Sequence, residues 1–259
     1  MVGQSALEKI RSEIDKFDAV LADTLSQRFE TAARIAVYKK ENGLAVYQPE
    51  REAEVLERLE RVLGDKAYGA EVKELFKQIF KMSRRVQFSE VFHHNVVLIG
   101  FMGTGKTTVG QYLANITGYI YYDVDKIIET RAAQPIDDIF KVHGEAYFRA
   151  LESEVIKELR SLQNAVIACG GGAVLDSANV KFLKEKGKLI WLKAELETVY
   201  PRISAEVNRP LVKGAKFDDI KALLNRREET YHCVADFEMI TDGKTVSEVG
   251  DEILSLLLT

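Results

Sequence analysis

Residues 100–107 read Gly-Phe-Met-Gly-Thr-Gly-Lys-Thr and match the phosphate-binding pattern G-x-x-x-x-G-K-[ST]. Its glycines let the backbone curl so that successive N–H groups point at phosphate oxygens. Lys106 can reach the β- and γ-phosphates of a nucleotide, and the hydroxyl of Thr107 can ligate Mg²⁺. The stretch follows an apolar run, Val96–Ile99, and precedes a predicted helix whose dipole favours anions at its start. It therefore predicts a nucleotide site between a buried strand and a helix.

Residues 91–259 alternate short apolar strands with helical stretches. After the run that precedes the phosphate loop, further strands are expected at 119–123, 165–169, 188–192 and 237–241. Strands that alternate with helices predict a parallel sheet covered by helices on both faces. We therefore expect an α/β P-loop domain with a parallel five-stranded sheet over these residues.

Two carboxylates follow the second expected strand. Asp123 and Asp125 come at its carboxyl end, the edge where ligands bind in open α/β folds. Alternation along a strand would point both side chains the same way. One of them can assist Mg²⁺, while the other accepts a proton from an attacking hydroxyl. Together with the phosphate loop, this pattern favours phosphorylation of a small molecule.

Residues 1–90 follow a different pattern, with three predicted helices and no convincing strand. The first runs from Ser5 to about Lys40, the second begins near Pro49, and the third spans about 69–88. A first helix of about 36 residues would be ~54 Å long. A domain of this size cannot cover its apolar stripe, so we expect a homodimer through this all-α domain.

Cationic residues on the first helix suggest an anion site. Arg28 and Lys39 are 11 positions apart and return to nearly the same face, so they can converge on one small anion. Arg11 lies 17 positions before Arg28, too far to touch the same ligand from one straight helix. An antiparallel partner helix could return Arg11 to the other chain's site. The alternative is that these are solvated charges on a helix surface.

The composition limits the functional class. The chain has 259 residues, a net charge of −4 and two cysteines. A nucleic-acid binder normally carries a basic excess, so we expect no nucleic-acid partner. No apolar run approaches the ~20 residues that cross a membrane. We therefore expect a cytoplasmic enzyme that has no membrane association.

The carboxyl-terminal region resembles shikimate kinase over nearly all of residues 95–259. The resemblance is carried by GFMGTGKTT at 100–108, D-V-D at 123–125, Phe148-Arg149, GGGAV at 170–174, NRPL at 208–211 and R-x-x-x-Y at 227–231. It implies that Asp125 binds the ring hydroxyls of shikimate and acts as base. It also implies that the ring and its carboxylate are held by Arg149, Arg227 and the turn Gly170, Gly171, Gly172.

The same resemblance implies an ATP and Mg²⁺ site. Its expected ATP contacts are Gly103, Thr104, Gly105, Lys106, Thr107, Thr108, Arg202 and Arg209. Arg209 would lie in a mobile lid and neutralise the transferring phosphate, and Arg202 would lie near the adenine. Thr107 and Asp123 are the expected metal ligands.

The helical region resembles the all-helical chorismate mutase family over residues 5–90. The resemblance is carried by Arg11, Arg28, Lys39, Arg51-Glu52, Ser83 and Gln87. It implies an intertwined dimer in which Arg11 comes from the partner, and a rearrangement of chorismate to prephenate that needs no cofactor. Arg11, Arg28 and Arg51 would hold the two carboxylates, Lys39 and Gln87 would donate to the ether oxygen, and Glu52 would accept from the ring hydroxyl. Gln48 departs from family members that carry an acid there.

Two complete sets of site residues predict a bifunctional enzyme whose substrates are chorismate, shikimate and ATP. An alternative from a different class makes the helical half a dimerising regulatory module that binds chorismate or prephenate and restrains the kinase. A third possibility keeps the phosphate loop but changes the acceptor to another small polyol.

Overall fold

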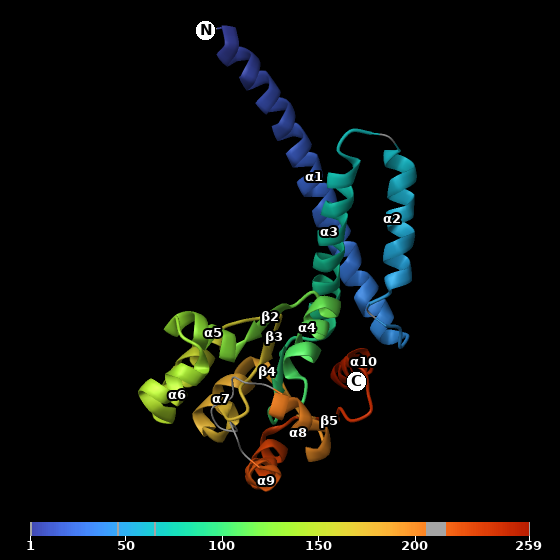
Figure 1. Ribbon diagram of the computed structural model, residues 1–259. Helices are drawn as coiled ribbons and strands as arrows, with labels where there is room; N and C mark the ends of the chain where they lie inside the picture. Colours follow the sequence, from blue (N-terminus) through green and yellow to red (C-terminus); the bar gives the residue numbers. More distant parts are fainter. Residues whose placement is uncertain (1, 46, 65, 206–215, 259) are drawn as a thin grey trace. The chain divides into compact units, whose positions relative to one another are not determined.

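The structure is a computed structural model that describes residues 2–45, 47–64, 66–205 and 216–258. The chain divides into two compact units, Met1–Val91 and Phe92–Thr259, each with its own packing. The first unit consists of helices, and the second contains both strands and helices (Figure 1).

The first unit is built from three helices, α1 (Val2–Glu41), α2 (Pro49–Leu63) and α3 (Gly69–Val91). The chain has no glycine or proline between Ser5 and Lys40, so nothing interrupts α1 until Asn42 and Gly43. Gly43 takes φ +63, a left-handed conformation suited to a residue that ends a helix. Pro49 begins α2, where its missing N–H costs no helical hydrogen bond. The predicted three-helix architecture is confirmed.

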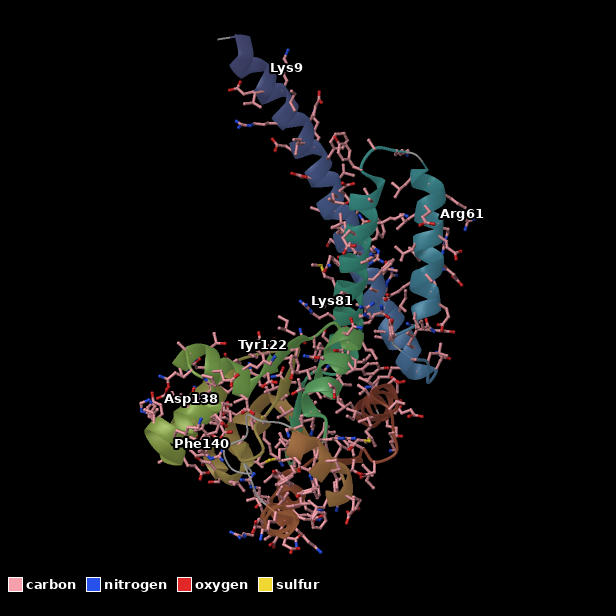
Figure 2. The ribbon with its side chains drawn as sticks, viewed as in Figure 1. Lys9, Arg61, Lys81, Tyr122, Asp138 and Phe140 are labelled. Atoms are coloured by element: carbon pink, nitrogen blue, oxygen red, sulfur yellow. The ribbon has the colours of Figure 1, made fainter. Side chains whose placement is uncertain are left out.

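The two halves of α1 differ in what covers them. In the carboxyl half, Ala32 and Ala36 are buried and α1 packs against α3, which contributes the buried Ile79 and Phe80. In the amino half, large apolar side chains are exposed: Ile10 by 56%, Phe17 by 73% and Val20 by 66%. This half extends past α2 and α3 (Figure 1). Its side chains, Lys9 among them, point away from the helix, and no described helix of the same unit covers them (Figure 2). Among the described residues, no helix is long and apolar enough to span a bilayer.

The second unit contains one all-parallel sheet. Its strands are β1 (Asn95–Ile99), β2 (Ile120–Asp123), β3 (Ala165–Ala168), β4 (Gly187–Lys193) and β5 (Phe237–Ile240). They lie in the order β2-β3-β1-β4-β5, and each neighbouring pair is parallel. The predicted parallel five-stranded sheet is confirmed. Every residue of β1 is buried, as its uninterrupted apolar sequence requires at the centre of a covered sheet.

Helices connect these strands and cover the sheet (Figure 1). They are α4 (Lys106–Thr117), α5 (Val124–Ala132), α6 (Ile136–Leu159), α7 (Ser177–Lys186), α8 (Leu196–Ala205), α9 (Phe217–Val234) and α10 (Val246–Leu258). A 3₁₀ turn, Ala173–Leu175, follows β3. Within α6 the helix is kinked at Gly144, whose φ of 79 and ψ of 173 are not helical.

The strand order explains where a ligand can bind. From β1 the chain crosses through α4 to β2 at one edge, whereas β4, on the other side of β1, leads to the opposite edge. Connections that leave a central strand in opposite directions open a crevice at the carboxyl ends of the strands. The phosphate loop, which follows β1 directly, lies at this crevice.

One buried side chain joins the amino ends of two strands. Asn95 of β1 is 3% exposed; its amide donates to the Leu162 carbonyl at 2.9 Å, and its Oδ1 accepts from the Ala165 N–H at 3.0 Å. Asn95 therefore provides a hydrogen-bond partner to the Leu162 carbonyl and to the Ala165 N–H, which lie before and at the start of β3.

We expect Asn95→Ala to lower the free energy of unfolding of this unit by about 1–3 kcal/mol, because it leaves a buried N–H and a partly buried carbonyl without those partners. Denaturant unfolding can be followed through Trp191, the single tryptophan of the chain, which is buried in β4. The exposed Gln111→Ala in α4 is the control and should leave the midpoint nearly unchanged. Equal midpoints for Asn95→Ala and wild type would contradict this account.

Candidate active sites

The phosphate loop is shaped by residues that have no side chain. Gly100 has φ +133, and a Cβ there would lie 2.4 Å from the carbonyl oxygen of Leu192. Gly105 has φ +91 and caps the start of α4. Both conformations strongly favour glycine. The loop therefore presents its backbone to the crevice and ends at the positive pole of α4.

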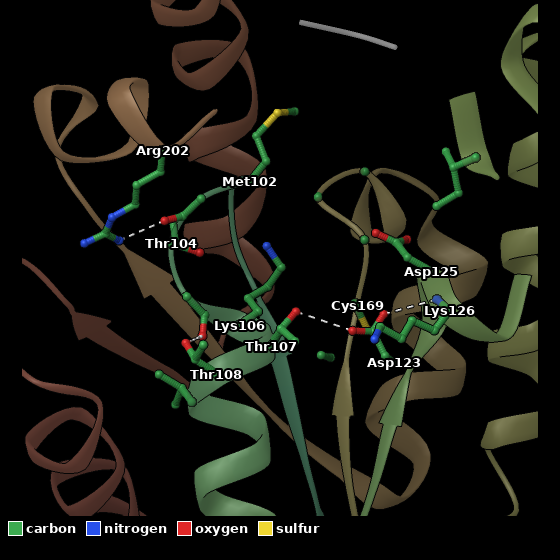
Figure 3. Close-up of a pocket in the computed structure, with 18 of the residues that line it drawn as sticks. Met102, Thr104, Lys106, Thr107, Thr108, Asp123, Asp125, Lys126, Cys169 and Arg202 are labelled. Atoms are coloured by element: carbon green, nitrogen blue, oxygen red, sulfur yellow. Dashed lines mark hydrogen bonds between the residues drawn. The ribbon is translucent and has the colours of Figure 1, made fainter. Parts of the chain in front are cut away.

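Two side chains at the start of α4 point toward the crevice. Lys106 Nζ donates to the carbonyls of Gly100 at 2.9 Å and Phe101 at 2.7 Å, so it lies over the loop. Thr107 Oγ1 donates to Asp123 Oδ2 at 3.4 Å, across the gap between α4 and β2 (Figure 3). The Tyr121 hydroxyl donates to the same carboxylate oxygen at 3.0 Å. Burial, followed by the charge of Asp123, raises the pKa of Tyr121, which keeps this hydroxyl protonated as a donor.

The oxygen atoms of Thr107 and Asp123 suit Mg²⁺, a hard cation that prefers oxygen ligands. In the described part of the chain, no cluster of three or more His, Cys, Asp or Glu side chains could hold a metal by itself. A cation bound here would therefore take its remaining ligands from phosphate oxygens and water, as Mg²⁺ commonly does.

The structure places the two aspartates differently from the strand-based expectation. Asp123 ends β2, and its Oδ1 caps α5 by accepting from the Lys126 N–H at 3.3 Å. Asp125 lies in the first turn of α5, so strand alternation does not determine its direction. The expectation that strand alternation orients both aspartates was wrong, because the chain turns into a helix at Val124. Both carboxylates nevertheless line the same pocket.

Arg149 extends from α6 into this pocket and is held by two carboxylates. Its Nη1 donates to Glu152 Oε2 at 2.6 Å, and its Nη2 donates to Glu145 Oε1 at 3.1 Å. The guanidinium also lies 5.2 Å from the ring centroid of Phe148. These contacts fix the plane of a cation that can bind a carboxylate.

The glycine turn after β3 brings the backbone close to four side chains. A Cβ at Gly170 would lie 2.7 Å from both Asp125 Oδ1 and Glu152 Oε1, and one at Gly172 would overlap the Arg149 guanidinium. The Gly171 carbonyl accepts from Arg227 Nη1 at 3.3 Å. At Gly170 and Gly172 a side chain would displace these site residues, so the approaches require glycine at both positions.

Arg227 of α9 is a buried cation with unused donor capacity. It is 5% exposed, and its Nε is buried with no hydrogen-bond partner. A guanidinium buried in this way gains most from a bound anion. Arg149 and Arg227 both line the pocket and so provide two cations near the carboxylate of Asp125.

The pocket has a volume of about 750 Å³ and connects the phosphate loop to these residues. The residues predicted for the kinase site that line this pocket are Gly103, Thr104, Gly105, Lys106, Thr107, Thr108, Asp123, Asp125, Arg149, Gly170, Gly171, Gly172, Arg202 and Arg227. Arg202 donates to the Gly103 carbonyl at 2.9 Å, which places it beside the loop (Figure 3). Arg209, the predicted lid cation, lies outside the described residues.

Glu152 is a site residue that the sequence reasoning missed. It is fully buried, it pairs with Arg149, and its Oε1 has no hydrogen-bond partner. Burial raises the pKa of Glu152, and Arg149 opposes that shift. The available signal was its position three residues after Arg149 on a predicted helix, the spacing of an ion pair.

The helical unit brings together a second group of polar side chains. Arg28 of α1 donates through Nη1 to Ser83 Oγ of α3, and Lys39 Nζ donates to Gln87 Oε1 at 3.3 Å. Burial lowers the pKa values of Arg28 and Lys39, and the charge of Glu52 opposes both shifts. The structure therefore places five of the predicted residues around one region of this unit.

Two predicted residues do not join this cluster within one chain. Arg51 forms an exposed ion pair with Glu54 at 2.7 Å. Arg11 is exposed on the uncovered half of α1, 17 positions before Arg28 and so about 25 Å away along the axis. Conversely, Arg84 was missed: its Nη1 is ion-paired with Glu52 Oε1.

Comparison with known families assigns both halves of the chain. The shikimate kinase family model matches residues 102–258, and the chorismate mutase type II model matches residues 10–88. The first match covers the phosphate loop from Met102 onward, the glycine turn and α9, and the second covers the cluster around Arg28 and Lys39. The predicted combination of these two families is confirmed.

Individual relatives agree for the second unit. The chain is 45% identical over 163 residues to a shikimate kinase of Moorella thermoacetica, a match that covers 63% of this chain and 94% of the relative. It is 41% identical over 160 residues to one from Persephonella marina, covering 62% of this chain and 96% of the relative.

Solved structures also share this fold. Shikimate kinase from Acinetobacter baumannii in complex with shikimate superposes with a TM-score of 0.64 and 34% identity, covering 67% of this chain and 97% of that chain. The Aquifex aeolicus shikimate kinase gives a TM-score of 0.57 at 37% identity, covering 63% of this chain and 95% of that chain. The chain therefore belongs to the shikimate kinase family and carries a chorismate mutase type II domain before its kinase domain.

Proposed function

We propose that the chain is bifunctional, with kinase chemistry in residues 91–259 and mutase chemistry in residues 1–90. The kinase domain transfers a phosphoryl group from ATP to the 3-hydroxyl of shikimate, and the helical domain rearranges chorismate to prephenate. The observation that carries the first half is the single pocket that joins the phosphate loop to Asp125, Arg149 and Arg227. The Acinetobacter baumannii relative, solved with shikimate, supports the acceptor. With both cysteines free, the proposed location is the reducing cytoplasm.

At the nucleotide end, the loop backbone binds phosphate oxygens and Lys106 neutralises charge on the transferring group. Gly103, Thr104, Gly105 and Thr108 complete the ATP contacts, with Arg202 beside them. Thr107 and Asp123 provide oxygen ligands for Mg²⁺, which screens phosphate charge when it is bound. Arg209 is retained as the proposed cation that closes over the phosphates.

At the acceptor end, Arg149 and Arg227 bind the carboxylate of shikimate, and the glycine turn lets the ring approach the backbone. Asp125 accepts the proton of the attacking hydroxyl, since its carboxylate lies against Gly170 in the pocket that also holds the phosphate loop. Holding both reactants in one pocket converts the transfer into an intramolecular step.

Lys106→Ala should lower the kinase kcat by about 10²–10³-fold, the usual effect of removing one strong electrostatic contact. Prephenate formation by the same protein should stay within about twofold of wild type, because Lys106 belongs to the other unit. A paired assay of ADP release with shikimate and of prephenate formation measures both rates. Loss of both activities in a folded variant would rule out independent sites.

In the helical domain, the proposed mutase site binds the two carboxylates of chorismate with cations. Arg28 is one of these cations and is supported by Ser83; Arg51 is the other, and it would have to leave its exposed ion pair with Glu54 to reach the ligand. Cleavage of the C–O bond builds negative charge on the ether oxygen, where Lys39 and Gln87 donate hydrogen bonds. Glu52 accepts from the ring hydroxyl. The step is a rearrangement within one molecule, so we propose no cofactor.

The regulatory alternative predicts that the helical domain binds chorismate or prephenate without converting it. A change at Lys39 distinguishes this alternative from a mutase. If the domain is a mutase, Lys39→Ala should lower its kcat by about 10²–10³-fold, and prephenate should leave the kinase rate unchanged. The exposed neighbour Lys40→Ala is the matched control, with nearly wild-type turnover expected. A kinase rate that responds to prephenate, together with no mutase turnover in wild type, would favour the regulatory module.

We also propose that the functional form is a homodimer through α1. Its amino half exposes Ile10, Phe17 and Val20, an apolar surface that a second copy of the same helix can cover. An antiparallel partner would carry its Arg11 toward the Arg28 of this chain, which no contact within one chain achieves.

Mixing Arg11→Ala chains with Arg28→Ala chains should restore about a quarter of wild-type mutase activity. Random exchange makes half the dimers mixed, and each mixed dimer has one intact site of two. Mixing Arg28→Ala with Lys39→Ala chains is the control, because both changes lie on the same chain's contribution and no intact site can form. No recovery in the first mixture, after subunit exchange has been verified, would refute a shared site.

A further inference from the structure

Arg84 lies on the same face of α3 as the predicted mutase residues. Ser83, Arg84 and Gln87 follow Phe80 at positions i+3, i+4 and i+7, a spacing that brings side chains together along one stripe of a helix. Arg84 is only 8% exposed, although arginine is rarely buried unless it is paired. A third cation therefore lies beside Arg28 and Lys39.

The guanidinium of Arg84 is fixed from two sides. Its Nη1 is ion-paired with Glu52 Oε1 of α2. Its Cζ lies 5.1 Å from the ring centroid of Tyr47, in the segment that leads into α2. A planar cation that stacks on an aromatic ring and donates to a carboxylate is restricted in both position and orientation. Arg84 thus joins three elements around Glu52.

Glu52 has three cations within electrostatic range. Its charge acts on both Arg28 and Lys39, where it opposes the effect of burial. Yet its close ion pair is formed with Arg84, while Arg28 donates to Ser83 and Lys39 donates to Gln87. The carboxylate is therefore held on the side of α3 that carries Arg84.

We propose that Arg84 is a positioning residue of the mutase site: by pairing with Glu52 it keeps that carboxylate from taking the place of a ligand carboxylate beside Arg28 and Lys39. The ion pair uses Oε1, and we assign Oε2 to accept from the ligand's hydroxyl. This inference rests on the proposed mutase function.

The physical reason is competition between carboxylates. Without Arg84, the nearest charge-neutralising partners of Glu52 are the two cations that the ligand needs, and ion pairs in a partly buried site are strong. Glu52 would then occupy the position of a ligand carboxylate. Binding should suffer more than turnover, and the loss should depend on the charge of Glu52.

The test compares the full-length wild type with Arg84→Met, Glu52→Gln and the double variant. In Arg84→Met, kcat/KM for prephenate formation should fall about 30-fold, mostly through a higher KM. In the Glu52→Gln background, the same change should cost less than about threefold, because there is no charge left to compete. Arg84→Lys, which keeps the charge but loses the planar stack on Tyr47, should fall between wild type and Arg84→Met.

Lys81→Met removes an exposed cation from the same helix and is the matched control. Thermal unfolding of the same variants is followed by helical circular dichroism, to separate positioning from a structural role. If Arg84 acted only through packing, Arg84→Met would lower stability and activity equally in the wild-type and Glu52→Gln backgrounds. Two results would overturn the inference: an Arg84→Met variant within twofold of wild type, or a double variant whose loss is the product of the single losses.

Calorimetric binding of chorismate to the same variants separates this inference from the proposed function. A wild type that binds chorismate without turnover should show the same charge-dependent pattern in Kd, which supports Arg84 and rejects catalysis. A wild type that turns chorismate over while Arg84→Met is unaffected rejects only Arg84. A wild type that neither binds nor converts chorismate rejects both.

Discussion

The central position of β1 in an all-parallel sheet is the constraint on which the kinase half depends. Parallel strands carry all their carboxyl ends to one edge, and the order β2-β3-β1-β4-β5 makes the connections diverge on either side of β1. The phosphate loop, the glycine turn after β3 and the cap of α5 all lie at that edge for this reason. Asn95 supports the arrangement from the opposite end of the strands, where it ties β1 to the start of β3.

The helical half is built around a different constraint, the length of an uninterrupted helix. A 40-residue α1 exceeds what α2 and α3 can cover, so its carboxyl half forms a domain core and its amino half does not. The same helix carries Arg28 and Lys39 on the covered half and Arg11 on the uncovered half. The exposed apolar surface and the distant Arg11 thus have one geometric cause. A second copy of the chain would cover that surface and bring its own Arg11 toward Arg28.

Both proposed sites contain a carboxylate paired with a guanidinium, close to the cations proposed to bind the substrate. In the kinase domain Glu152 pairs with Arg149, and in the helical domain Glu52 pairs with Arg84. The roles are reversed in the proposed chemistry. Arg149 is the ligand's cation and Glu152 orients it, whereas Glu52 is the ligand's carboxylate and Arg84 orients it. In each case burial makes an unpaired charge costly, so the pair determines which groups remain for the ligand.

The sequence by itself determined the local structures whose cause is local. Glycine spacing defines the phosphate loop, because only glycine takes its backbone conformations, and uninterrupted periodicity defines α1. Apolar runs between helices predict the parallel sheet. The tertiary structure alone decided where side chains from distant segments meet. It placed Asp125 in the first turn of α5, where strand alternation does not apply, placed Glu152 and Arg84 in the two proposed sites, and paired Arg51 with Glu54. Those outcomes depend on packing between elements far apart in the chain, and a one-dimensional pattern of residue types contains no distance between them.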